Sequence, residues 1–243
     1  MERTSQLDRC RTGCCTMIFS DLADQEFTEL IALMTPISYS SHETIFREGT
    51  PVFGIYIICE GLVKVAEKFA DGKQQILKLL GPGEILGEEA LFIDEVYIDH
   101  AVTLSPVRVM FIRGEEFLDF LKGHPQVTFK LLEKLSRELK AFQSKLVETA
   151  YGCCEERLAR LLWLAGEKYG VEEQDGLRIG VEFSRDELAE MTGVATETII
   201  RGLGHLKEAG ILSITGRRIT IRDLPRLKAL AHYLPVTAEE SIL

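Results

Sequence analysis

The sequence predicts an α+β fold: an N-terminal antiparallel β-roll or jelly roll, one long helix, and a C-terminal helical unit that ends in a β-hairpin. Short apolar runs alternate with turn signals over residues 36–111, and apolar residues recur at helical spacing over residues 124–150. Helix-start, turn and hairpin signals then follow one another between residues 184 and 221. A chain of 243 residues is long enough for one large or two modest domains.

Composition excludes several classes of protein. The apolar fraction of 46% is enough for a folded core. A run of about 18 apolar residues is absent, so no transmembrane helix and no membrane partner are expected. The N-terminus is polar and lacks the apolar core of a secretory signal, which favours a cytoplasmic location. A net charge of −10 argues against a non-specific nucleic-acid coat protein, but it leaves room for a small DNA-binding module.

We expect residues 1–17 to form a flexible head and residues 18–123 to form the β domain. A helix is predicted from Asp24, as N-cap, to Met34, because its apolar positions repeat at helical spacing. Turn signals every 8–12 residues then predict an antiparallel sandwich or barrel, and Asp71-Gly72 predicts a hairpin. The predicted strands are Gly54–Cys59, Leu62–Ala66, Gln75–Leu80, Ala101–Leu104 and Val107–Ile112.

A long helix is predicted over residues 124–150. Its apolar residues have the 3-4-3-4 spacing of a seam along which two helices pair. The opposite face is charged, which favours pairing with a second copy over packing on the helix's own domain, although both arrangements bury such a stripe. The seam residues are Leu132, Leu135, Leu139, Phe142 and Leu146.

Residues 151–230 read as a second domain, followed by a tail over residues 231–243. Tyr151-Gly152 breaks the long helix, and an amphipathic helix follows from Glu155 to about Tyr169; Glu172–Gly176 is expected to be a polar loop.

Ser184 with Glu187 forms a capping-box pattern at the start of a helix. A glycine turn at 191–194, a second helix closed by Gly210, and a hairpin over 211–221 complete a predicted winged helix-turn-helix.

In such a unit the N-terminal half of the second helix enters the major groove of DNA. We expect Thr196, Glu197 and Arg201 to read bases, because Arg pairs with guanine and a carboxylate accepts from cytosine. Other polar and basic residues of the unit are suited to phosphates. They are Ser184, Arg185, Thr198, Lys207, Arg217 and Arg218.

The order of a β domain, a long seam helix and a winged helix resembles the Crp/Fnr family of bacterial transcription regulators, over residues 18–230. The motif Glu197-Thr198-Ile199-Ile200-Arg201 carries the resemblance, and the family's base-reading Glu and Arg fall on Glu197 and Arg201. Ile200 replaces the Ser of the Fnr branch and Thr196 the Arg of the cAMP-receptor branch, so the half-site is expected to differ. The resemblance implies a sensor domain, a homodimer paired through residues 126–148, a palindromic site and RNA polymerase as partner.

Gly87-Glu88-Glu89-Ala90-Leu91 resembles the family's phosphate-binding cassette, in which Glu holds the ribose hydroxyl and a later Arg clamps the cyclic phosphate. That Arg position falls here on Ile98 or Asp99, before His100. No Lys or Arg occurs between Lys78 and Arg108, so a cyclic phosphate would meet carboxylates and no cation. We therefore expect a degenerate cassette (Gly87, Glu88, Asp99, His100) that does not bind cAMP or cGMP.

The cysteines suggest signals other than a cyclic nucleotide. Clustered thiolates suit iron–sulfur clusters or zinc. Cys10, Cys14 and Cys15 lie where the Fnr branch carries most of its cluster ligands, but with a different spacing, and Cys153-Cys154 lies at the hinge before the DNA-binding domain. An iron–sulfur cluster, thiol or disulfide chemistry, haem or another metal, and an unrelated effector all remain open.

Two rival functions are weaker. A cyclic-nucleotide-binding module, or a regulator that responds to cyclic nucleotides, would need the missing cation of the cassette. A cysteine-dependent redox enzyme would need an activated nucleophile, and the sequence has no Cys-x-x-Cys within a βαβ pattern. We therefore predict a DNA-binding regulator that is not an enzyme and responds to a signal other than a cyclic nucleotide.

Overall fold

The computed structural model describes residues 18–93 and 96–231. The chain divides into two compact units, one up to Arg137 and one from Glu138 onward. Within the described residues, no helix is both long and apolar enough to cross a membrane. The elements follow the predicted order of β domain, long helix and helix-turn-helix with a hairpin, so the predicted fold class is confirmed.

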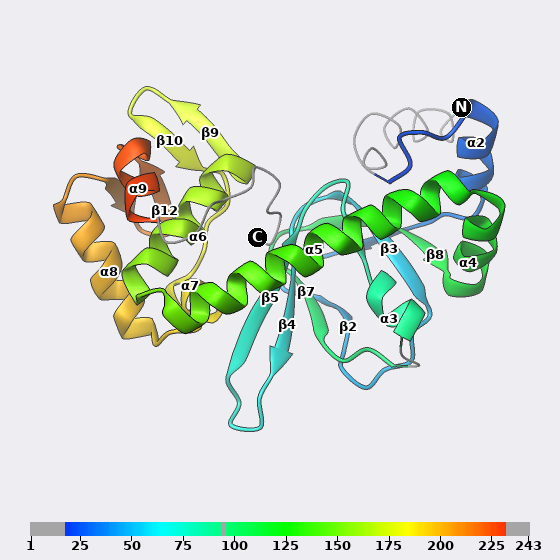
Figure 1. Cartoon of the computed structure of the whole chain (residues 1–243), viewed down its shortest axis with the longest axis horizontal. Coiled ribbons are helices and arrows are strands. Elements are labelled where there is room, and N and C mark those ends of the chain that lie inside the picture. Colours follow the sequence, from blue (N-terminus) through cyan, green and yellow to red (C-terminus); the bar gives the residue numbers. More distant parts are fainter. Residues whose placement is uncertain (1–17, 94–95, 232–243) are drawn as a thin grey trace. The chain divides into compact units, whose positions relative to one another are not determined.

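The first unit contains two four-stranded antiparallel sheets (Figure 1). One has the strand order β1-β8-β3-β6 and the other β2-β7-β4-β5. Glycine at 72, with a φ of +84°, lies in the turn between β4 and β5, as the Asp71-Gly72 signal predicted. The strands are β1 (Thr35–Tyr39), β2 (Thr44–Phe46), β3 (Gly54–Glu60), β4 (Val63–Lys68), β5 (Gln74–Leu80), β6 (Ile85–Leu86), β7 (His100–Thr103) and β8 (Val107–Arg113).

Strand β3 shows why the apolar runs are continuous rather than alternating. Ile55 and Ile57 belong to a core cluster that also contains side chains of the helices, whereas Tyr56 and Ile58 belong to a second cluster that includes Val65 of the other sheet. Successive side chains of a strand point to opposite faces. Both faces of β3 are therefore buried from Gly54 to Cys59, and only Glu60 at the end of the strand is charged and exposed.

The described residues of this unit include three short helices: α2 (Asp24–Ala32), α3 (Glu88–Ile93) and α4 (Gly114–Gly123). The prediction of Asp24 as N-cap is wrong by one residue, because Ala23 holds that position and Asp24 is the first helical residue. The Ala23 amide donates to the Glu26 carboxylate at 2.8 Å, so the acid at N3 satisfies the helix start without a polar N-cap side chain.

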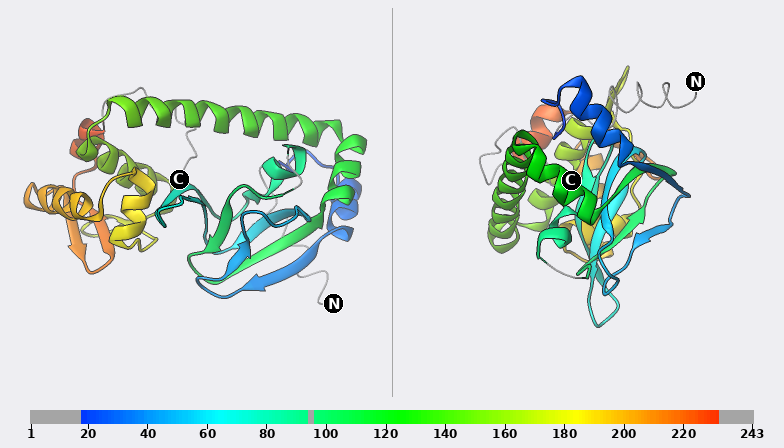
Figure 2. Two further views of the ribbon diagram at one scale, coloured as in Figure 1. Left: turned by 90° about the horizontal axis from the view of Figure 1, so that it is seen from below. Right: turned by 90° about the vertical axis from the view of Figure 1, so that its right-hand side faces the viewer.

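Helix α5 (Pro125–Tyr151) is continuous through the end of the first unit into the second (Figure 2). Val127 and Leu131 are buried and belong to the helix-side core of the first unit. The helix ends at Tyr151, where the sequence predicted the break.

The second unit contains the helix-turn-helix and one four-stranded antiparallel sheet with the order β11-β12-β10-β9. The prediction of a polar loop at 172–176 is wrong, because these residues belong to a hairpin in which the exposed strand β9 pairs with β10. Its polar sequence hides the strand pattern, and Glu173 forms an ion pair with Arg178 at 2.5 Å. The elements are α6 (Cys154–Tyr169), β9 (Gly170–Glu173), β10 (Gly176–Ile179), α7 (Arg185–Thr192), α8 (Thr196–Glu208), β11 (Leu212–Thr215), β12 (Arg218–Ile221) and α9 (Leu224–Leu230).

The predicted capping box at the start of α7 is present. The Ser184 hydroxyl accepts from the Glu187 amide at 3.1 Å, and the Ser184 amide donates to the Glu187 carboxylate at 2.7 Å. Gly193 ends α7 with a φ of +66°, a left-handed conformation that residues with a side chain rarely adopt. This turn separates α7 from α8 and sets the start of α8 at Thr196.

Candidate nucleic-acid interface

Helix α8 has one buried and one exposed face. Ile199, Leu203 and Leu206 are buried, whereas Glu197 and Arg201 are exposed. Residues four apart lie on one face of a helix, so these two predicted base-reading side chains project together. The exposed face therefore offers one acceptor and one forked donor side by side, the groups that distinguish base edges in the major groove.

Thr196, the third predicted base reader, is already engaged. Its hydroxyl donates to the Asp186 carboxylate of α7 at 2.8 Å. Because the hydroxyl group already donates its one hydrogen bond to Asp186, its oxygen can only accept a hydrogen bond from a base. Thr198 accepts from the Arg201 guanidinium at 3.5 Å, a long contact that places Thr198 beside Arg201.

The predicted phosphate contacts come from both ends of the helix-turn-helix. Arg217 and Arg218 are exposed at the hairpin turn, and Lys207 is exposed near the end of α8. Arg185 differs, because its guanidinium donates to the Gly216 carbonyl at 3.1 Å and links the start of α7 to the hairpin turn. Partial burial lowers the pKa of Arg185 below its usual value. The Ser184 hydroxyl oxygen accepts the capping hydrogen bond of α7, so this hydroxyl group remains able to donate a hydrogen bond to a phosphate.

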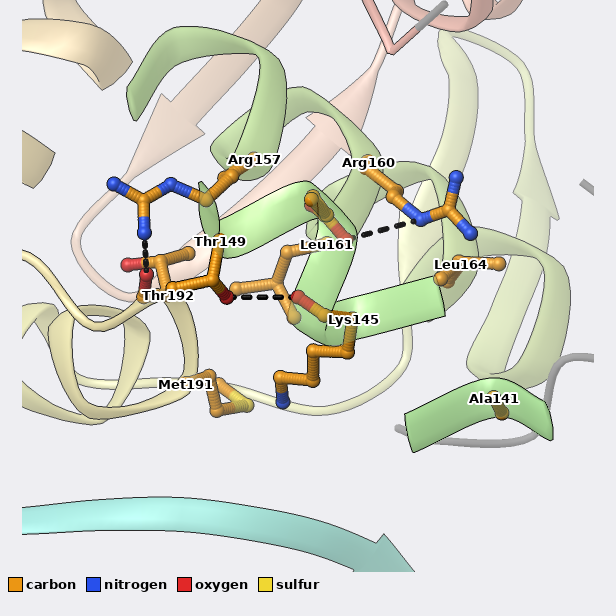
Figure 3. Close-up of a pocket in the computed structure, with 10 residues that line it drawn as sticks. Ala141, Lys145, Thr149, Arg157, Arg160, Leu161, Leu164, Met191 and Thr192 are labelled. Atoms are coloured by element: carbon orange, nitrogen blue, oxygen red, sulfur yellow. Dashed lines mark hydrogen bonds and ion pairs between the residues drawn. The ribbon is translucent and has the colours of Figure 1, made fainter. Parts of the chain in front are cut away.

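Arg157 supports the helix-turn-helix from α6, a role that the sequence analysis missed. Its guanidinium donates to the carbonyl of Thr192, the last residue of α7, at 3.0 Å (Figure 3). A cation at a helix C-terminus is favourable, because the final carbonyls carry partial negative charge. A cavity of about 560 Å³, partly open to solvent, lies beside this contact, and Arg160 at its wall forms an ion pair with Glu148 at 3.4 Å.

The cassette-like segment borders a cavity of about 480 Å³ in the first unit, also partly open to solvent. Gly87 lines it with a φ of +90°, a backbone shape that favours glycine. Glu88 is buried and forms an ion pair with Lys134 of α5. The carboxylate expected to hold a ribose hydroxyl is therefore already paired with a helix outside the cassette.

The prediction that this cavity contains no cation is wrong. Lys78 comes from strand β5, lines the cavity and forms an ion pair with Glu89. The sequence concealed this, because Lys78 lies 11 residues before Glu89 and reaches it only across the fold. An acidic partner already neutralises the ammonium, so it differs from the Arg that the family uses as a phosphate clamp.

Asp99 lines the same cavity, whereas His100 does not. Burial raises the pKa of Asp99 to about 6, and Glu89 adds to the shift while Lys78 opposes it. His100 is buried, and its Nε2 lies 3.3 Å from the Gln74 side-chain oxygen. Burial lowers the pKa of His100. Of the predicted cassette residues, Gly87, Glu88 and Asp99 therefore line one cavity and His100 stands apart.

The predicted seam of α5 is partly exposed and partly packed. Leu132, Leu139 and Leu146, spaced by seven, have exposed fractions of 54%, 61% and 71%. Leu135 packs partly against the core of the first unit, and Phe142 is half-buried. An apolar stripe of this kind, exposed along successive turns, is typical of a surface that pairs with another helix.

The described cysteines do not form a cluster site. Cys59 is buried in the core, Cys153 is exposed, and Cys154 is partly buried at the first position of α6. The Cys154 sulfur accepts from the Arg157 guanidinium at 3.6 Å. No group of three or more metal-ligating side chains occurs among the residues that the structure describes. Cys10, Cys14 and Cys15 lie outside these residues.

Comparisons with known proteins match both parts of the chain. Residues 36–124 match a family model described as the cyclic nucleotide-binding domain, and residues 156–230 match the Crp-like helix-turn-helix domain. These ranges contain the cassette cavity and the exposed face of α8, respectively.

Full-length relatives match across both units. A CRP-like cAMP-activated global transcriptional regulator of Mycobacterium tuberculosis is 25% identical over 86% of this chain and 94% of its own. An anaerobic regulatory protein of Bacillus subtilis is 29% identical over 80% of this chain and 83% of its own. The solved structure of FixK2 from Bradyrhizobium japonicum has the same fold, with a TM-score of 0.74 and 24% identity over 83% of this chain and 99% of that one.

Proposed function

Because this chain belongs to the Crp/Fnr family of transcription regulators and is not an enzyme, we propose that it acts as a homodimer on an inverted-repeat DNA site. It is a DNA-binding regulator of the Crp/Fnr type. The proposal of a specific DNA site rests on the exposed pair of Glu197 and Arg201 on α8. Glu197 accepts from a base and Arg201 donates to one, while Arg217, Arg218 and Lys207 contact phosphates.

Dimer formation through α5 gives the DNA site its symmetry. The exposed leucines at 132, 139 and 146 support this pairing, since an isolated helix gains nothing by displaying them to water. Two copies related by a two-fold axis would place their α8 helices in successive major grooves, about 34 Å apart. The site is then an inverted repeat, and the bound dimer acts on transcription by contacting RNA polymerase.

The controlling signal in this proposal is not a cyclic nucleotide, although the Mycobacterium relative is named as cAMP-activated. Two contacts support this part. Glu88 is committed to Lys134, and Lys78 to Glu89, so neither the ribose nor the phosphate of a cyclic nucleotide finds an unpaired partner there. A cyclic phosphate would also face the Asp99 carboxylate, and neither Ile98 nor Asp99, the two positions on which the family's Arg falls, supplies a cation.

A redox signal is the second candidate, and the contact of Cys154 with Arg157 favours it. Arg157 also holds the end of α7, so oxidation of this thiol would disturb a residue that supports the helix-turn-helix. An iron–sulfur cluster would need Cys10, Cys14 and Cys15. Iron and sulfide analysis of protein purified without oxygen distinguishes the two, because a cluster contains both elements and thiol chemistry changes only the free-thiol count.

Selection of binding sites from randomised DNA tests the proposal. We expect an inverted repeat whose half-site centres lie about one helical turn apart. Retention of a single half-site by a monomer, or binding without sequence preference, would contradict it. Tight binding only in the presence of cAMP or cGMP would favour the alternative of a regulator that responds to cyclic nucleotides.

A further inference from the structure

The cassette cavity has an unbalanced charge. Lys78 pairs with Glu89 and Lys134 pairs with Glu88, so these groups neutralise one another. Asp99 is left over: among the described residues, its carboxylate forms no hydrogen bond or ion pair with another residue. The cavity therefore has one carboxylate in excess, in a partly buried position where water compensates it poorly.

The rest of the wall is apolar. Phe46 and Tyr97 line the cavity with their rings stacked, 3.8 Å between centroids and 6° between planes. Ile93 and Ile98 also line it and are exposed, which places them where the cavity meets solvent. A concave, largely apolar space with a few convergent polar groups is the usual form of a small-molecule site, and aromatic rings in its wall can attract cations.

We propose that this cavity binds a small organic monocation, an ammonium or guanidinium on an apolar frame, with the cationic group on Asp99. This deepens the proposed function, because it names the chemical class of a signal other than a cyclic nucleotide. An anion of similar size is disfavoured twice, since it repels Asp99 and offers nothing to the paired Glu88 and Glu89. Glu88, which lines the cavity, forms an ion pair with Lys134 of α5. A bound ligand that shifts Glu88 therefore also acts on that helix.

The groups that face Asp99 come from three elements. Glu89 of α3 and Glu67 of β4 raise the pKa of its carboxyl, and Lys78 of β5 lowers it. Burial is the largest cause, and the resulting pKa is about 6. A cation therefore binds best above pH 6, where Asp99 is ionised, and loses affinity as the carboxyl gains a proton below that pH.

Three probes with one frame and different charges test the proposal by calorimetry on the full chain: 2-phenylethylammonium, 2-phenylethanol and 3-phenylpropanoate. A hydrogen bond to a charged group is worth about 1.5–3 kcal/mol, which corresponds to roughly tenfold or more in affinity. We expect the ammonium to bind about tenfold more tightly than the alcohol, and the carboxylate to bind more weakly than either.

Asp99→Asn should reduce the affinity for the ammonium to that for the alcohol and remove its pH dependence. Asp119→Asn, an exposed carboxylate on α4, is the matched control and should change neither. Equal binding of ammonium and carboxylate, unchanged ammonium binding in Asp99→Asn, or no binding of any probe would each overturn the proposal. DNA binding by Asp99→Asn is measured alongside: if it persists, the proposed function stands whatever the probes show.

Discussion

Glu88 on α3 and Lys134 on α5 form an ion pair between the cassette cavity and the long helix. The Glu88 side chain is almost fully buried, and Lys134 is mostly covered. A carboxylate inside a protein is stable only when a cation or several donors compensate it. The pair therefore makes the cassette structurally dependent on α5, the helix that we propose to pair in the dimer.

Removal of the cation should be costly. Lys134→Ala leaves the buried Glu88 carboxylate without this partner and should destabilise the chain by about 3–5 kcal/mol in denaturant unfolding. The double variant Glu88→Gln/Lys134→Met should recover most of this loss, because it removes both charges. Lys130→Ala is the matched control on the same helix: its more exposed pair with Asp21, at 3.4 Å, is screened by water and should contribute little to stability. Equal losses in the two Lys→Ala variants would contradict this account.

Arg201→Ala should impair sequence recognition. We expect a loss of about 1–3 kcal/mol per half-site on the selected sequence and much less on random DNA. Arg217→Ala serves as the comparison, because a phosphate contact should weaken binding to all sequences alike and reduce the salt dependence. Titrations of both variants at two salt concentrations separate these effects. Equal losses on specific and random DNA would remove Arg201 from the base-reading residues.

Leu139→Asp should convert the dimer to monomers. The substitution would place a charge in the centre of the proposed apolar interface, at a cost of several kcal/mol when no partner compensates it. Light scattering measures the molar mass, and DNA binding should be lost together with the dimer. Leu139→Met keeps the volume and the apolar character and should remain dimeric. A Leu139→Asp protein that stays dimeric would place the interface elsewhere.

Cyclic nucleotides should not bind usefully. Calorimetry with cAMP and cGMP should detect nothing tighter than about millimolar, because a charge-assisted clamp on the cyclic phosphate is missing. A micromolar dissociation constant for either nucleotide would overturn this prediction.

Asp99 should make stability depend on pH. Its pKa of about 6 lies above the usual 3.8, so the folded state holds this proton more tightly than the unfolded state does. Asp99 therefore favours folding least above pH 6, where its carboxylate is ionised. Asp99→Asn should be more stable than the parent at pH 7, and this advantage should disappear as the pH falls from 6 to about 4. An advantage that is independent of pH would exclude titration of Asp99 as the cause.

Local signals in the sequence determined much of the DNA-binding unit. The capping box at Ser184 and Glu187, the glycine turn at Gly193 and the pattern of buried residues in α8 all act within a few residues. Interactions of that range depend on side-chain chemistry and backbone preference, so a single sequence is enough to predict them. For the same reason the exposure of Glu197 and Arg201 could be predicted from spacing alone.

Tertiary structure alone decided the contacts between distant segments. The cation in the cassette cavity comes from β5, the partner of Glu88 comes from α5, and Arg157 of α6 supports the end of α7. The strand β9 is polar and exposed, and only pairing with β10 makes it a strand. These features depend on which backbone segments pack side by side. Hydrophobic burial drives that packing but is not directional, so a periodic pattern predicts an element without predicting its neighbours.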